Sequence, residues 1–178
     1  MIAERRRQFE DPDLPFLLVQ LPGYGPISKQ PTFSTWASLR EAQRHTALAD
    51  KHAAIVVTVD IGDPADLHPT NKREVGRRLS IAARHLIYGE RIPPSGPMVT
   101  RIRRRGSDVV VSFRDVSGVL TMRRPIPSGF ELCGDTAASC RWADARVEGA
   151  SVLLSNAAGA TRVRYAWGGS PVCPLADG

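Results

Sequence analysis

Two apolar runs in the first half of the chain have the pattern of strands that are buried on both faces. Residues 15–21 read PFLLVQL and residues 53–60 read AAIVVTVD, and neither run alternates between apolar and polar positions. Continuous apolar runs of this length are typical of strands in a parallel sheet. We therefore expect the two runs to belong to one parallel sheet.

Each apolar run is followed by a segment with helical spacing. The apolar or small residues that share one helix face are Trp36, Leu39, Gln43 and Ala47 in 34–50, and Val75, Leu79, Ala82 or Ala83, and Leu86 in 71–88. Thr70 is the expected N-cap of the second helix, and Gly89 is its expected C-terminal stop. The order strand, helix, strand, helix predicts parallel strands joined by a right-handed crossover.

The pattern changes near Arg91, where the sequence IPPSGP reads as a linker. Short β-like segments follow, separated by turn residues: 109–113, 119–122, 130–132, 141–147, 151–155 and 161–167. Short strands at this spacing are typical of a small β-sandwich-like domain. The sequence therefore predicts an α/β domain over 1–91 and a small all-β domain over 92–178.

Composition and charge narrow the function classes. The 178 residues carry a net charge of +6, and no run of about 18 apolar residues exists, so we expect no membrane insertion. The N-terminal residues also lack the apolar core of a secretory signal. The densest basic cluster, Arg101 with Arg103, Arg104 and Arg105, has no interleaved aromatic residues. We interpret it as a charged, solvated strand edge rather than as a nucleic-acid surface.

The three cysteines do not form a CxxC pair, so the sequence predicts no zinc site. Cys133 and Cys140 are close enough in sequence to bridge a hairpin in an oxidising compartment. Buried free thiols are the alternative that we favour, because cysteine is often simply buried. The sequence does not indicate whether Cys173 forms a disulfide.

An acidic loop at the end of the second apolar run carries the candidate chemistry. It holds Asp60, Asp63, Asp66 and His68, and Pro69 restricts the backbone beside the histidine. In open parallel sheets, functional groups gather where strands end. A serine hydrolase needs an imidazole to take the hydroxyl proton and a carboxylate to orient that imidazole. A solvated, inert loop and a metal site of hard oxygen ligands are the alternatives, although no regular ligand spacing is present.

The block DIGDPADLHPTNKREVGRRLSIAARHLIYG resembles the last strand, histidine loop and last helix of the sialate O-acetylesterase family, which are SGNH-type carbohydrate esterases. PFLLVQLPGYG, WASLREAQ, SGPM and VRYAW fall in the family's order around it. The resemblance implies part of a three-layer α/β/α SGNH hydrolase sheet with a neighbouring β domain. It also implies hydrolysis of acetyl esters on sialic acid or related sugars, without a metal or an organic cofactor. Members of the family are often secreted, periplasmic or lysosomal.

By this resemblance His68 is the catalytic base, whereas its acid is left open. SGNH enzymes place an aspartate three residues before the histidine, and this chain has Ala65 there. Asp66 is our first choice and Asp63 the alternative, and a Ser-His dyad steadied by a backbone carbonyl is a third arrangement. Arg40 and Gln43 are weak candidates for substrate binding, and a structural role is our preferred interpretation of both.

The family's nucleophile lies in a Gly-x-Ser turn after an early strand, and this chain has no such turn. Ser28, Ser34, Ser38 and Ser95 are the nearest serines, and none follows a buried strand in a glycine-flanked turn. We therefore expect the chain to be the C-terminal portion of a longer esterase, with a β domain that is cut short. Its expected partners are the missing N-terminal segment and an O-acetylated sialic acid or another acetylated glycan, such as xylan.

A non-enzymatic alternative also fits the sequence. The α/β half would be an inactive remnant, and the β half would be a carbohydrate-binding or structural module. Trp142 and Trp167 are the candidate sugar platforms, although both lie in strand-like runs, where tryptophan is usually a core residue.

Overall fold

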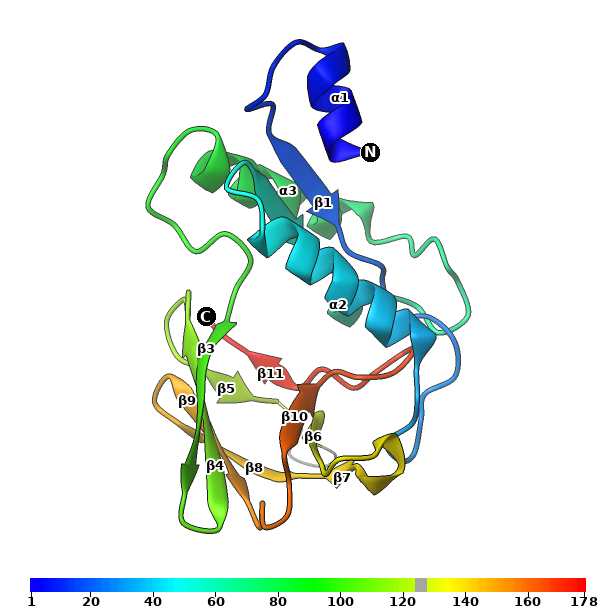
Figure 1. Ribbon diagram of the computed structural model, residues 1–178, viewed down its shortest axis with the longest axis vertical. Helices are drawn as coiled ribbons and strands as arrows, with labels where there is room; N and C mark the ends of the chain where they lie inside the picture. Colours follow the sequence, from blue (N-terminus) through cyan, green and yellow to red (C-terminus); the bar gives the residue numbers. More distant parts are fainter. Residues whose placement is uncertain (124–127) are drawn as a thin grey trace.

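The computed structural model describes residues 1–123 and 128–178. Its first half contains a short parallel pair, β1 (Phe16–Val19) and β2 (Ala53–Val56), in which Phe16 lies opposite Ala53. The helices are α1 (Ile2–Gln8), α2 (Thr35–Leu48) and α3 (Lys72–Leu86), and η1 (Val59–Ile61) is a single 3₁₀ turn. α2 packs against β2, and α3 packs against both strands. These elements form the upper part of the molecule in Figure 1.

The two longer helices begin and end close to the residues that the sequence predicts. Ser34 caps α2 by accepting a hydrogen bond from the Ala37 backbone N–H. The N-cap of α3 is Asn71 and not Thr70, because the Asn71 side chain is the one that accepts from the Glu74 N–H. Gly89 has a φ of 70° beyond the end of α3, a left-handed conformation that suits a chain stop.

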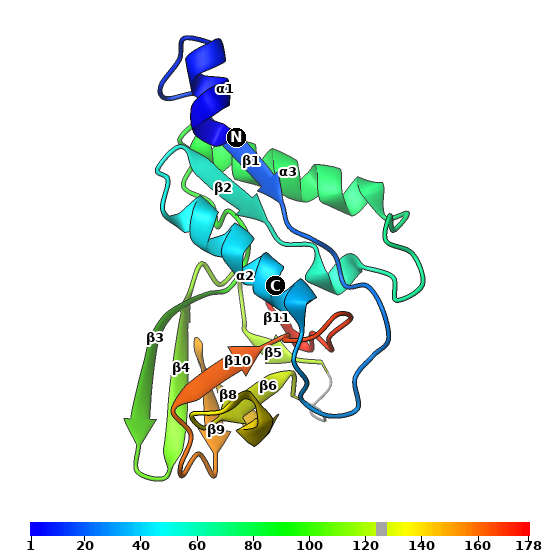
Figure 2. The same ribbon diagram turned by 45° about the vertical axis from the view of Figure 1, so that its right-hand side comes forward.

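The second half is antiparallel β structure and forms the lower part of the molecule (Figures 1 and 2). A four-stranded sheet has the order β3 (Met98–Arg105), β4 (Asp108–Arg114), β9 (Ser151–Ser155) and β8 (Asp144–Glu148). A three-stranded sheet has the order β10 (Arg162–Tyr165), β6 (Phe130–Cys133) and β7 (Arg141–Trp142). β5 (Thr121–Met122) pairs with β11 (Leu175–Ala176), and η2 (Ala137–Ser139) precedes β7.

The two larger sheets share one hydrophobic core. Buried side chains come from both of them: Val109, Val111, Val152 and Leu154 from the first, and Phe130 and Leu132 from the second. Each such side chain contributes about 1.5–3 kcal/mol when it leaves water. The chain is therefore a mixed α/β protein with several antiparallel sheets, as the sequence predicts at this level.

Several details differ from the sequence expectations. Residues 141–147 form two strands in different sheets, because Ala143 is buried between them and its N–H bonds to the Phe130 carbonyl. The predicted elements do not include α1, β3 or β11. The arginine cluster does lie on an edge strand, since β3 is the outermost strand of its sheet and is exposed along nearly its whole length.

The preferred interpretation of the cysteine pair is wrong in this structure. Cys133 and Cys140 form a disulfide, with the sulfur atoms 2.12 Å apart, and Cys173 is a free thiol. The two cysteines flank a short turn between β6 and β7, and this adjacency favours closure. Among the described residues, none of the helices has the length and apolar character needed to cross a membrane.

Candidate active site

The acidic loop begins where β2 ends, and close backbone contacts fix its first residues. A Cβ atom added at Gly62 would lie 2.2 Å from the Gly23 carbonyl oxygen, so only glycine fits there. The Gly25 N–H donates to the Pro64 carbonyl at 3.0 Å. The Thr58 hydroxyl donates to the Gln20 carbonyl. The loops that leave β1 and β2 are therefore packed on each other, at the end of the strands where functional groups gather.

Asp60 is engaged in an ion pair with α3. Arg78 donates to its two carboxylate oxygens at 2.6 and 2.7 Å, and also to the Val57 carbonyl at 2.8 Å. Arg78 and Arg77 both bond to Glu74, and these bonds lower the pKa of Glu74 to about 2. The hydrogen bond from Arg78 to Asp60 is the main cause that raises the pKa of Arg78. Asp60 therefore fastens the strand end to the helix.

His68 is exposed, and so are Asp63 and Asp66. Asp66 accepts a hydrogen bond from the His68 backbone N–H at 2.7 Å, and Asp63 accepts one from the Ala65 N–H at 2.8 Å. Both carboxylates thus shape the turn, as aspartates often do in loops. Within residues 1–123 and 128–178, neither ring nitrogen of His68 has a hydrogen-bond partner. The imidazole is free to accept a proton from a group that approaches through solvent, and the acid assignment stays a prediction.

The candidate serines have other roles in the part of the chain that the structure describes. Ser34 caps α2, Ser38 donates to the Ser34 carbonyl, and the Ser28 hydroxyl lies 3.4 Å from that of Thr32. Ser95 lies in the linker at the wall of a cavity. None of these hydroxyls bonds to His68 there, so the structure does not bring a nucleophile to the imidazole.

That cavity has a volume of about 670 Å³ and separates the end of β2 from the C-terminal segment. Asp60, Arg78, Tyr165 and Cys173 lie on its wall, whereas His68 does not. Burial raises the pKa of Cys173 to about 12, so its thiol is protonated at neutral pH and is a poor nucleophile. No local sequence pattern predicts this wall, because its residues come from distant segments.

Arg40 and Gln43 are used inside the protein. Arg40 is only 5% exposed, and its guanidinium donates to the carbonyls of Ala166, Gly168 and Gly169. Desolvation lowers its pKa. The Gln43 side-chain oxygen accepts from the Leu21 N–H at 3.0 Å. Both residues connect elements of the fold, which agrees with the structural interpretation, and substrate contact by either stays untested.

The acidic loop does not gather its side chains as metal ligands. In residues 1–123 and 128–178, the one group of three or more possible ligands within 4.8 Å of one another is Glu131, Cys133 and Cys140. Two of these three are joined as a disulfide, and metals bind the thiolate form of cysteine.

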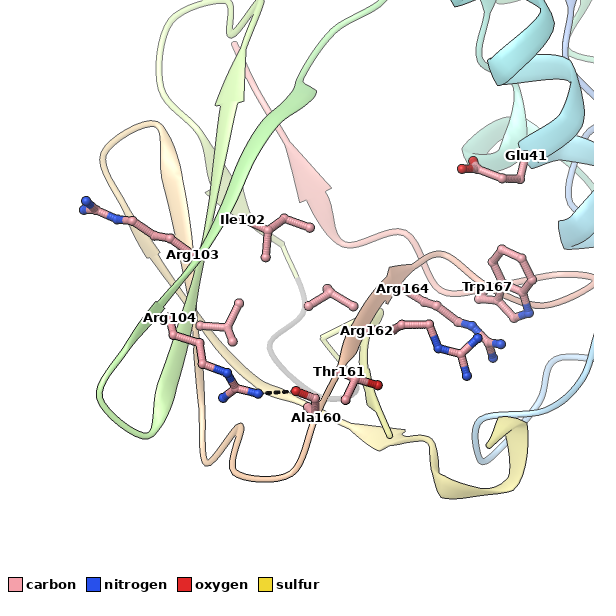
Figure 3. A pocket seen from close by; sticks show the side chains of 11 residues that line it. Glu41, Ile102, Arg103, Arg104, Ala160, Thr161, Arg162, Arg164 and Trp167 are labelled. Carbon is pink, nitrogen blue, oxygen red and sulfur yellow. Dashed lines mark hydrogen bonds between the residues drawn. The ribbon is translucent and has the colours of Figure 1, made fainter. Parts of the chain in front are cut away.

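A second cavity, of about 600 Å³, lies between the β3 edge, β10 and α2. Figure 3 shows Arg162, Arg164 and Trp167 on one wall, Ile102 and Arg104 on another, and Glu41 at the α2 side. Arg104 is held by the carbonyls of Ala157 and Ala160, and Arg103 directs its guanidinium away from the other labelled side chains.

Comparison with known proteins gives an informative similarity. No family model matches the chain, and no curated protein matches it. A solved structure described as a novel carbohydrate acetylesterase from Xanthomonas citri is 37% identical and aligns with a TM-score of 0.81. The similarity covers 96% of this chain and 40% of that chain. It supports a relationship to carbohydrate esterases, and the specific sialate O-acetylesterase family stays a prediction.

Proposed function

We propose that this chain carries the histidine loop of a carbohydrate acetylesterase that hydrolyses acetyl esters on sialic acid or related sugars. The observation that carries the proposal is the position of His68. It lies on the loop that leaves a parallel strand, in a chain 37% identical over 96% of its length to a carbohydrate acetylesterase. The serine nucleophile comes from outside these 178 residues.

The proposed chemistry is acyl transfer through an acyl-enzyme. The serine hydroxyl attacks the acetyl carbonyl, and His68 takes the hydroxyl proton and returns it to the sugar oxygen as that oxygen leaves. Water, activated by His68, then releases acetate. The exposed His68 ring supports this role, because a base must be reachable by both the serine and water.

Asp66 is the proposed acid, with Asp63 as the alternative. Asp66 supports this assignment because its carboxylate already bonds to the His68 backbone N–H and so lies beside that residue. Asp63 begins the turn that contains Asp66, because its carbonyl accepts from the Asp66 N–H at 3.3 Å and its side chain accepts from the Ala65 N–H. Replacing each aspartate by asparagine separates the two assignments, because only the acid supports the imidazolium.

A chimera tests the proposal. The region of the Xanthomonas citri enzyme that aligns with this chain is replaced by the 178 residues, and acetate release from O-acetylated sialic acid and acetylated xylan is measured. We expect activity that His68→Ala reduces by about a thousandfold or more. His85→Ala is the matched control, since His85 lies on α3 and bonds to the Glu90 carbonyl.

Two results would contradict the proposal. One is a chimera with native-like folding and turnover that His68→Ala leaves unchanged. The other is robust turnover by the isolated chain that depends on His68, because a serine of this chain would then be the nucleophile. A preference for xylan over sialic acid would keep the esterase and change its substrate.

The cavity beside Trp167 favours a second candidate function, carbohydrate binding by the β half. Trp167 lines this cavity beside Arg162 and Arg164, and because the Arg164 guanidinium lies over one face of the indole, a sugar ring would stack on the other face. Trp142 is a weaker platform, because its indole N–H is already bonded to the Lys29 carbonyl at 3.2 Å. Glycan binding by the full chain that Trp167→Ala abolishes and Trp142→Ala preserves would support this function.

A further inference from the structure

A buried carboxyl group lies on the face of β6 that points away from the hydrophobic core. Glu131 has no exposed surface, and neither of its oxygens has a hydrogen-bond partner among the described residues. Its neighbour on β10 is Arg164, whose nearest nitrogen lies 3.8 Å away, beyond hydrogen-bonding distance. Its neighbour on β7 is the uncharged Trp142. Desolvation raises the pKa of Glu131 to about 7, and the charge of Arg164 opposes this shift.

The carboxyl group lies beside the disulfide. Glu131 and Cys133 are two residues apart on one strand, so their side chains share a face. A Glu131 oxygen and the two sulfur atoms all lie within 4.8 Å of one another. Cys133 is completely buried, whereas Cys140 is partly exposed. A reagent from solvent therefore reaches Cys140 first.

Arg164 is placed to stabilise negative charge on the exposed sulfur. Its guanidinium donates to Cys140 Sγ at 3.3 Å, and its charged carbon lies 4.6 Å from the centre of the Trp167 ring. A neighbouring cation favours the thiolate form of cysteine and makes it a better leaving group. Arg164 also lines the cavity in Figure 3, so this side of β10 faces open space.

We propose that Cys133, Cys140, Glu131 and Arg164 form a thiol–disulfide exchange site that an external dithiol reduces. The site is separate from the His68 loop, and the proposal does not depend on the esterase function. Partial burial of the disulfide, a buried acid beside its inner sulfur and a cation beside its outer sulfur are the parts that such chemistry needs.

The proposed reaction balances. A thiolate of the dithiol attacks Cys140 Sγ, the protein S–S bond breaks, and its electron pair goes to Cys133 Sγ. The protonated Glu131 carboxyl gives its proton to that sulfur. The second thiolate of the dithiol then attacks its own sulfur in the mixed disulfide and releases Cys140 as a thiolate beside Arg164. The dithiol loses two electrons to become a disulfide, the protein gains them, and solvent returns the proton to Glu131.

The test follows reduction of the full chain by dithiothreitol, with alkylation and peptide mapping to distinguish the three cysteines. The measured quantity is the rate of reduction of the Cys133–Cys140 disulfide divided by the concentration of dithiothreitol thiolate. We expect it to fall about tenfold between about pH 6 and about pH 8, as Glu131 loses its proton. Glu131→Gln is expected to remove this dependence and to be about tenfold slower near pH 6. Asp135→Asn is the matched control, because Asp135 is an exposed carboxyl on the same turn.

A Glu131→Gln profile equal to that of the unchanged chain would overturn the proposal. A second measurement needs no variant at Glu131, in case that variant does not fold. The unchanged chain is treated with 2-mercaptoethanol and quenched, and the adduct is expected on Cys140 with Cys133 alkylated. An adduct on Cys133, or reduction only under unfolding conditions, would also overturn it.

Discussion

Single residues decide how the His68 loop is held against the rest of the molecule. Gly62 touches the backbone of Gly23, and Arg40 gathers carbonyl groups from a segment more than a hundred residues later. Neither residue belongs to the proposed chemistry. Both residues hold together the part of the fold that carries the loop. We therefore expect substitutions at either residue to lower the free energy of unfolding.

Replacing Gly62 by alanine is expected to destabilise the chain by about 2 kcal/mol, because the new Cβ would overlap backbone atoms that cannot move aside cheaply. Gly76→Ala is the control. It lies within α3 with no atom within 4 Å of an added Cβ, and alanine there is expected to stabilise by about 0.5–1 kcal/mol. Urea unfolding measures both changes. Equal effects of the two substitutions would contradict the contact at Gly62.

Arg40→Ala is expected to cost about 3 kcal/mol, since it leaves buried carbonyl groups without their charged donor. Arg73→Ala on the exposed side of α3 is the control and is expected to change stability by less than about 0.5 kcal/mol. The free energy of unfolding from urea titrations distinguishes them. A loss below about 1 kcal/mol for Arg40→Ala would show that water replaces the guanidinium.

Among the elements, η1 and α3 enclose the acidic loop from both sides. Asp60 belongs to η1, Glu74 lies in the first turn of α3, and Arg78 bonds to both. A carboxylate in the first turn of a helix is also favoured by the helix dipole. The ends of the His68 loop are therefore tied to each other by charged hydrogen bonds.

This network predicts a specific acid sensitivity. The pKa of Glu74 is lowered to about 2 from an ordinary 4.5, so its contribution to stability is complete above about pH 4.5 and is lost as the pH falls toward about 2. Between these values, the unchanged chain is expected to lose about 1 kcal/mol more than Glu74→Gln, a figure reduced for solvent screening. Urea unfolding at several pH values checks this. Glu10→Gln is the control, because Glu10 is an exposed carboxyl, and its stability is expected to change with pH as that of the unchanged chain does. If the stability of Glu74→Gln also changed with pH as that of the unchanged chain does, the prediction would be refuted.

For the whole molecule, local periodicity predicts the individual strands and helices better than it predicts how the strands pair with one another. The apolar runs of β1 and β2 and the stripe of α3 are visible in sequence because each is continuous. The split at Ala143 was not visible, since it depends on a bond to Phe130 in another strand.

The candidate site was predictable to the same extent. His68 could be placed on a loop after a strand from its neighbours alone. The buried pair of Glu131 and Arg164 and the cavity wall with Cys173 depend on contacts between segments far apart in sequence. Such contacts leave no periodic signal, because each involves one residue from each segment.

The parallel pair β1–β2 predicts how the chain behaves in solution. In the described residues it is a two-stranded sheet with both outer edges unpaired, and Val19 at the end of β1 is 44% exposed. Unpaired edges with exposed apolar residues promote association. We expect sedimentation velocity to show concentration-dependent self-association that Val19→Lys reduces. Val119→Lys is the control, because Val119 is 68% exposed in a loop away from this sheet. A single monomeric species with cooperative unfolding at every concentration would show that these edges are protected by their own twist and short length.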